Sequence, residues 1–235
     1  MTDATYFASV DLAPARHLQR AGQWDTALAL LPEGPQALLL RAEILVERHM
    51  WRLDQPDEAL AAVERLRDAQ PEPAAFLTGQ LEYWRRILRP GAPQIADDPI
   101  ATFAALAADE RFGGWTGFWH AVSLELLGRD ASAAAVGYER ALAEATARGD
   151  LLLESYAVRH LGSQAWDAGR GEQAIALLER SLDLRAARAA RPHTAAAQAA
   201  LAEVLGETPG GAERVASLRS VVTATAEELG LTWLK

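Results

Sequence analysis

Residues 155–185, SYAVRHLGSQAWDAGRGEQAIALLERSLDLR, restrict the fold more than any other stretch of the chain. The small and apolar residues of the first half share one helical face: Val158, Leu161, Gly162 and Ala165. At Gly162 another helix can approach closely. The glycines of residues 169–171 break the helix, and apolar residues recur at helical spacing over residues 174–184. This pattern predicts a hairpin of two helices.

The spacing within the hairpin resembles the tetratricopeptide repeat, a helix pair of about 34 residues. The matching residues are Val158, Leu161, Gly162, Ala165, Gly169, Ala174, Leu178 and Ser181. The sequence departs from the repeat at Val158, Leu178 and Ala186, where Trp, an aromatic residue and Pro are common. The resemblance implies stacked helix pairs in which the first helix of each pair lines a concave groove.

Weaker copies of the hairpin occur on both sides of it. The small residues that mark the second helices are Ala27, Ala59, Ala101, Ala133, Ala174 and Ala212, at intervals of 32, 42, 32, 41 and 38 residues. We therefore expect an all-α, right-handed α-solenoid of roughly six antiparallel helix pairs. It would form a single domain over residues 1–235, with its most regular repeat at 155–188 and a short tail at 230–235. The alternative is an irregular helical bundle.

Composition agrees with an all-α fold and limits the function. Half of the residues are hydrophobic, and strand-type alternation is nearly absent. The chain has no cysteine, which excludes disulfides and thiolate chemistry. Its net charge of -9 argues against a nucleic-acid partner. No signal-peptide pattern and no apolar stretch of about 18 residues is evident, so we expect a cytoplasmic protein without a membrane partner.

Projected onto this sequence, the resemblance places aromatic and charged residues on the groove. They are Arg48, Trp51, Arg52, Tyr83, Trp84, Trp115, Phe118, Trp119, Glu125, Tyr156, Arg159, His160, Ser163, Trp166 and Asp167. Independently of the family, Trp115, Phe118, Trp119 and Val122 form one helical stripe. Such a stripe can equally belong to a core. In residues 155–167, however, other residues already supply a core face, which leaves the polar and aromatic face to line a pocket or groove.

No catalytic residue, metal site or cofactor is assigned. His160, Ser163 and Asp167 share a helical face, but His160 and Asp167 would lie roughly 10 Å apart along the axis, too far for a catalytic triad. His160 alone stays a candidate acid or base. The histidines are scattered, without the spacing of metal ligands. Arg185, Arg188 and Arg191 form a row that we interpret as a solvated helix end rather than a binding patch.

The sequence is compatible with two functions. In the first, a non-catalytic module holds a peptide segment or protein partner in its groove, where aromatic residues anchor apolar side chains and Arg48, Arg52 and Arg159 orient carboxylates. In the second, a small-molecule receptor or pathway enzyme closes its aromatic residues into a pocket around His160, and Arg159 binds an anionic ligand. Homo-oligomers are compatible with both hypotheses, and Trp233 is a candidate plug for the groove. Enclosure and perturbed titratable groups would favour the second hypothesis.

Overall fold

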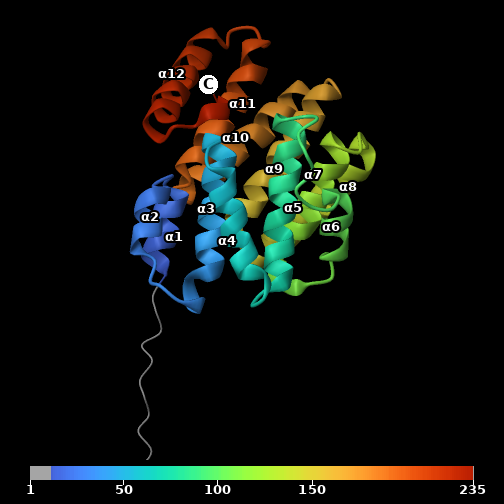
Figure 1. The fold of residues 1–235 in the computed structure, drawn as a ribbon. Coiled ribbons are helices and arrows are strands. Elements are labelled where there is room, and N and C mark those ends of the chain that lie inside the picture. Colours follow the sequence, from blue (N-terminus) through green and yellow to red (C-terminus); the bar gives the residue numbers. More distant parts are fainter. Residues whose placement is uncertain (1–11, 235) are drawn as a thin grey trace, which may run out of the picture.

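The computed structural model describes residues 12–234, which contain twelve α-helices, three short 3-10 helices and no strand (Figure 1). The α-helices are α1 (Ala13–Arg20), α2 (Trp24–Leu30), α3 (Leu38–Arg52), α4 (Pro56–Arg67), α5 (Pro71–Leu88), α6 (Pro99–Ala105), α7 (Trp115–Leu126), α8 (Ala131–Arg148), α9 (Leu151–Asp167), α10 (Gly171–Ala187), α11 (Arg191–Gly206) and α12 (Ala212–Leu229). The 3-10 helices are η1 (Pro35–Ala37), η2 (Glu110–Phe112) and η3 (Thr232–Leu234). The all-α prediction is confirmed. The sequence predicts that the first helix pair begins at residue 8. Residues 8–11 lie outside the described range.

Local sequence signals set many of the helix boundaries. The carboxylate of Asp98 caps α6 by accepting a hydrogen bond from the Ala101 amide at 3.3 Å, as the Asp-Pro pair predicts. Asp130 caps α8 in the same way, through the Ala133 amide at 2.9 Å. Gly149 ends α8 in the left-handed conformation, where an L side chain is strained.

Helices that are consecutive in the chain pack against each other through apolar faces. The pair α9 and α10 is the predicted hairpin, and its close approach occurs at Gly162. A Cβ atom at Gly162 would lie 3.2 Å from the Cβ of Leu177 and the Cγ of Leu178. The absence of a side chain at this position therefore sets the distance between the two helices, as the sequence predicts.

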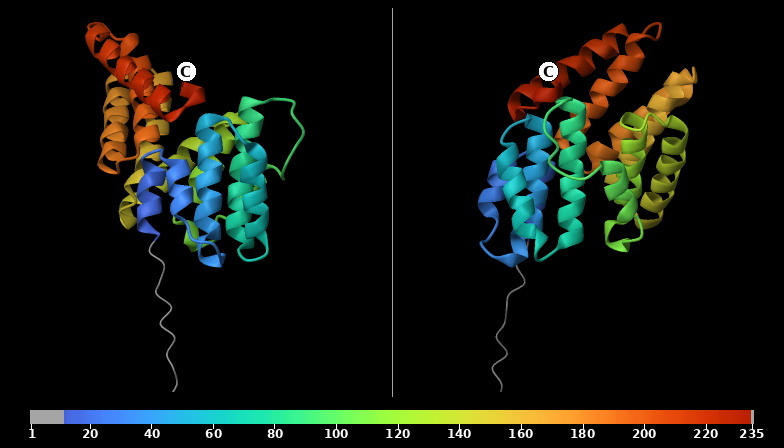
Figure 2. Two further views of the ribbon diagram at one scale, coloured as in Figure 1. Left: turned by 60° about the vertical axis from the view of Figure 1, so that its left-hand side comes forward. Right: turned by 45° about the vertical axis from the view of Figure 1, so that its right-hand side comes forward.

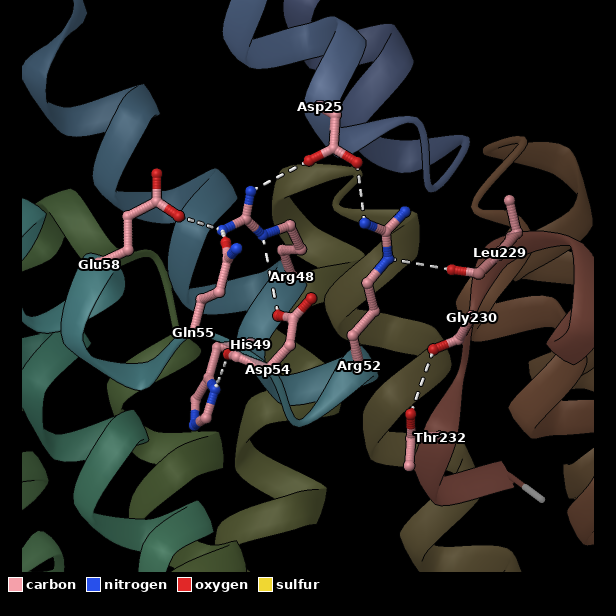
Figure 3. Close-up of polar contacts among 10 residues, drawn as sticks. All are labelled: Asp25, Arg48, His49, Arg52, Asp54, Gln55, Glu58, Leu229, Gly230 and Thr232. Carbon is pink, nitrogen blue, oxygen red and sulfur yellow. Dashed lines mark hydrogen bonds and ion pairs between the residues drawn. The ribbon is translucent and has the colours of Figure 1, made fainter.

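The C-terminal helices return to the N-terminal ones. In both Figures 1 and 2, α11 and α12 lie beside the upper ends of α1 to α3. One hydrophobic cluster joins Trp24, Ile44 and Trp51 of the first helices to Leu229 and Leu231 of the last segment. Nε of Arg52 also donates to the Leu229 carbonyl oxygen at 3.1 Å (Figure 3). The first and last helices of residues 12–234 thus meet along a seam.

Candidate functional site

Two adjoining cavities lie between the odd-numbered helices. The large cavity has a volume of about 480 Å³ and the small cavity about 160 Å³. All α-helical residues that line the large cavity come from α1, α3, α5, α7, α9 and α11. Met50, Trp119, Tyr156 and His193 line both cavities and form the wall between them. The small cavity also receives Arg185 from α10 and Trp233 from η3.

Two carboxylates from adjacent turns of α3 line the large cavity. Glu43 pairs with Nη1 of Arg16 at 3.0 Å, and Oε2 of Glu47 accepts a hydrogen bond from the Gln19 amide at 2.7 Å. The other carboxylate oxygen of Glu47, Oε1, is buried and has no hydrogen-bond partner among residues 12–234. Burial raises the pKa of Glu47 to about 7, although the Gln19 amide and the nearby indoles of Trp24 and Trp51 oppose this rise. Glu47 can therefore hold a proton near neutral pH.

His193 of α11 stands between the two cavities. Its ring meets Trp51 edge-on at 5.1 Å and Tyr156 at 5.5 Å between centroids. Nδ1 is buried without a hydrogen-bond partner in the described part of the chain. Burial, followed by the charge of Arg185, lowers the pKa of His193 to about 3. The ring is thus neutral at physiological pH.

Tryptophan side chains dominate the small cavity. Trp51 stacks on Trp233 with ring centroids 5.3 Å apart, and Trp84 lies within 6.4 Å of both Trp119 and Trp233. The Nε1 atoms of Trp84, Trp119 and Trp233 are buried and have no hydrogen-bond partner within residues 12–234, whereas the Trp51 indole lies beside the Glu47 carboxylate. Buried donors of this kind are normally satisfied. The small cavity therefore combines an apolar wall with unused hydrogen-bond donors.

Arg159 and Arg185 line the small cavity, and neither forms an ion pair with a carboxylate in residues 12–234. Arg185 is 2% exposed and donates to the carbonyl oxygen of His193 at 2.8 Å and to Oγ of Ser155 at 3.3 Å. Its guanidinium lies over the Tyr156 ring at 4.9 Å. Burial lowers the pKa of Arg185 to about 10, so it keeps its charge. The expectation of a solvated helix end is wrong for Arg185, because α10 turns this side chain inward.

His160 is held by both of its ring nitrogens. Nδ1 lies 3.1 Å from Oε2 of Glu125, and Nε2 lies 3.3 Å from Nη1 of Arg159. Glu125 also accepts hydrogen bonds from the Tyr138 hydroxyl and the Gln164 amide, each at 2.7 Å. Burial lowers the pKa of His160 to about 4. In the neutral ring Nδ1–H donates to Glu125, and the lone pair of Nε2 faces Arg159. Neither nitrogen is free to act as a base.

The structure brings most of the predicted site residues together around the cavities. The residues that line one or both cavities are Trp51, Tyr83, Trp84, Trp115, Phe118, Trp119, Tyr156, Arg159 and His160. Phe118, Trp119 and Val122 are also buried in a hydrophobic cluster. The aromatic stripe thus belongs to the core and lines a cavity, so the two interpretations of the stripe are not exclusive.

Arg48 and Arg52 line neither cavity, and only Arg52 contacts the last segment at the seam (Figure 3). Nη1 of Arg48 and Nη1 of Arg52 contact the two oxygens of Asp25 at 3.0 and 2.8 Å. Arg48 also pairs with Glu58 and Gln55. These contacts hold α2, α3 and α4 together and direct both guanidinium groups away from the cavities.

The remaining predicted residues lie away from both cavities. Glu125 supports His160 from behind, and the hydroxyl of Ser163 donates to the Arg159 carbonyl oxygen at 3.3 Å. Trp166 packs against a separate cluster that contains Leu178 and Leu201, and Asp167 is exposed. Ser163 and Asp167 therefore do not assemble with His160 into a triad.

Sequence reasoning missed Glu43, Glu47, Arg185 and His193. The first two lie at i and i+4 on α3, and Met50 follows at i+7, so helical spacing could have placed them on one face. No spacing signal distinguishes Arg185 from the exposed Arg188. The burial of Arg185 follows from the contact of α10 with α9 and α11.

No protein-family model matches the chain, and no curated protein is similar to it at a significant level. In residues 12–234, no three or more His, Asp or Glu side chains are grouped so that they could hold a metal ion. Within the same residues, no helix has the length and apolarity that crossing a membrane requires. The two cavities thus combine aromatic walls with five arginines and the protonatable carboxyl group of Glu47.

Proposed function

We propose that this protein is a non-catalytic receptor for a small organic molecule, built on a solenoid of tetratricopeptide-like helix pairs. The ligand would occupy the large cavity and extend into the small one. Three features support the repeat scaffold: the spacing of the marker alanines, the packing of consecutive helices, and the lining of the interior by odd-numbered helices. In a repeat of this kind the first helix of each pair would face the binding surface.

A single observation carries the receptor proposal. The aromatic residues of separate helices converge on a partly open cavity of about 480 Å³, whose polar groups include the Glu47 carboxyl group and Nδ1 of His193, which is unpartnered within residues 12–234. Small-molecule sites typically span roughly 300–1,000 Å³ and combine apolar walls with a few convergent polar groups. Unsatisfied buried polar atoms cost about 1–3 kcal/mol each, which a matching ligand would recover.

Two further contacts favour a small molecule over a peptide or protein partner. Trp233 stacks on Trp51 and lines the small cavity, so the C-terminal segment occupies space that an extended peptide would need. The ring nitrogens of His160 are occupied, which favours binding without turnover. The proposed protein therefore recognises its ligand by shape, stacking and hydrogen bonds.

The proposal is tested with a library of mono- and bicyclic aromatic metabolites, using the shift in thermal unfolding temperature as the measurement. We expect some compounds to raise the melting temperature of the wild-type protein, since a ligand of the folded state adds about 2.7 kcal/mol of stability at 100 times Kd. Trp119→Ala should abolish the shift. Trp166→Ala, which removes a tryptophan away from both cavities, is the matched control and should retain it. A response to peptides alone, or to no small molecule, would overturn the receptor function.

A further inference from the structure

The small cavity contains more positive charge than its surroundings neutralise. Arg159 and Arg185 both line it, and their charges repel each other, which contributes to the lowered pKa of Arg185. Two acidic side chains of α7 and α9, Glu125 and Glu154, have other partners. Glu154 pairs with Arg180 at 2.6 Å, and Glu125 is engaged by His160, Tyr138 and Gln164. Within the described chain, neither arginine has a carboxylate partner.

A buried arginine without a counter-charge is costly, and folded proteins seldom contain one. Arg185 is among the largest fully buried side chains of the protein. Its Nε and Nη1 hydrogen-bond to neutral oxygens, whereas Nη2 has no hydrogen bond to any residue in 12–234. A donor thus remains for an anion that enters the cavity, and a carboxylate matches the planar geometry of a guanidinium.

The other walls define the body of the ligand. Trp51, Trp84 and Trp233 present ring faces and edges, and the Nε1 atoms of Trp84 and Trp233, unpartnered within residues 12–234, add neutral donors. The volume of about 160 Å³ is close to the roughly 150 Å³ of an engineered protein cavity that binds benzene. The volume of the small cavity therefore matches one six-membered ring.

We propose that the small cavity is an anion site, in which Arg159 and Arg185 bind the carboxylate of a monocyclic aromatic acid while the tryptophans enclose its ring. This inference rests on the receptor function proposed above and names the chemical class of its ligand. His160 positions Arg159 through the contact of Nε2 with Nη1. Trp233 closes the cavity from the C-terminal segment.

Benzoate and its neutral isostere benzamide provide the test, because they differ by one charge at almost constant shape. We expect calorimetric titration to show that benzoate binds wild-type protein at least ten times more tightly than benzamide. Arg159→Gln and Arg185→Gln should each weaken benzoate about 10- to 100-fold, the range for loss of a hydrogen bond to a charged group. The same substitutions should change benzamide affinity by less than about threefold. Arg140→Gln removes an exposed arginine of α8 that lines neither cavity, and it should leave both affinities unchanged.

The outcomes separate the two proposals. If compounds of the aromatic library bind but benzoate is no tighter than benzamide, the receptor function stands and the anion site is wrong. If no compound of the library and neither probe binds, both fail. Since Arg185→Gln can impair folding, Arg159→Gln provides a second variant on a half-buried side chain, and circular dichroism verifies its fold. Unchanged benzoate affinity in folded Arg159→Gln protein also overturns the anion site.

Discussion

At the scale of single residues, the carboxyl group of Glu47 gives the protein a definite pH dependence. Burial raises its pKa from 4.5 to about 7, so the folded state keeps a proton that the unfolded state loses above pH 4.5. The stabilisation from Glu47 is therefore complete below pH 4.5 and is lost as the pH rises through 7. The loss is about 3 kcal/mol, at 1.36 kcal/mol per pKa unit. We expect Glu47→Gln, which cannot ionise, to escape this loss. Urea unfolding of both proteins at pH 5 and pH 8 measures their free energies of unfolding. An equal loss of stability in Glu47→Gln and the wild type would contradict the burial of Glu47.

The ionisation of His193 makes the stability of the protein depend on pH in the opposite direction. Its pKa is lowered from 6.5 to about 3, so the unfolded state gains a proton below pH 6.5 while the folded state stays neutral. Its contribution to stability is complete above pH 6.5 and decreases by about 2 kcal/mol on acidification to pH 5. His193→Gln should remove this part of the acid sensitivity. The measurement is the free energy of unfolding at pH 7.5 and pH 5. An equal acid loss in the variant and the wild type would show that His193 is accessible to protons.

At the scale of elements, a buried carboxylate fixes the longest loop. Glu82 of α5 is fully buried, pairs with Arg85 and Arg86 at 2.6 and 2.8 Å, and accepts a hydrogen bond from the Ile95 amide at 3.1 Å. We expect Glu82→Ala to cost about 3–5 kcal/mol, because it leaves arginine donors and a loop amide without a partner. Glu64→Ala, which breaks an exposed pair with Arg67, should cost less than about 1 kcal/mol. Chemical unfolding of both variants tests this, and similar costs would refute the role of Glu82.

The helices and part of the cavity lining could be predicted from the sequence, whereas the contacts between distant helices could not. Helical periodicity, the Asp98-Pro99 start and the glycine break before α10 are local, so the helices could be read directly from the chain. The aromatic lining of the cavities could also be predicted from the sequence, because Phe118 and Trp119 lie on one helical stripe. The inward turn of Arg185 and the burial of Glu47 depend on which helices meet across the interior. Contacts between residues far apart in the chain leave no periodic signal.

At the scale of the whole molecule, the seam joins the first helices to the last ones, and Gly22 allows their close approach. Gly22 has a φ of 77°, and a Cβ atom would lie 2.8 Å from Cδ1 of Leu229 and 3.0 Å from Cγ of Pro192. Gly149 offers a matched comparison, with a φ of 67° and no atom within 4 Å of the added carbon. Both positions require the left-handed conformation, whose cost for alanine is about 1–2 kcal/mol. Any additional cost at Gly22 therefore reports on contact across the seam.

We expect Gly22→Ala to destabilise the protein by about 1 kcal/mol more than Gly149→Ala, because Leu229 must move and the cluster at the seam loosens. Amide hydrogen exchange should then show faster exchange in α1 and also in α12, although about 190 residues separate them along the chain. Gly149→Ala should affect only the turn between α8 and α9. If Gly22→Ala changes exchange in α1 and α2 alone, the seam does not couple the two ends. In that case the interior opens independently of global unfolding, and Trp233 cannot serve as a fixed wall of the small cavity.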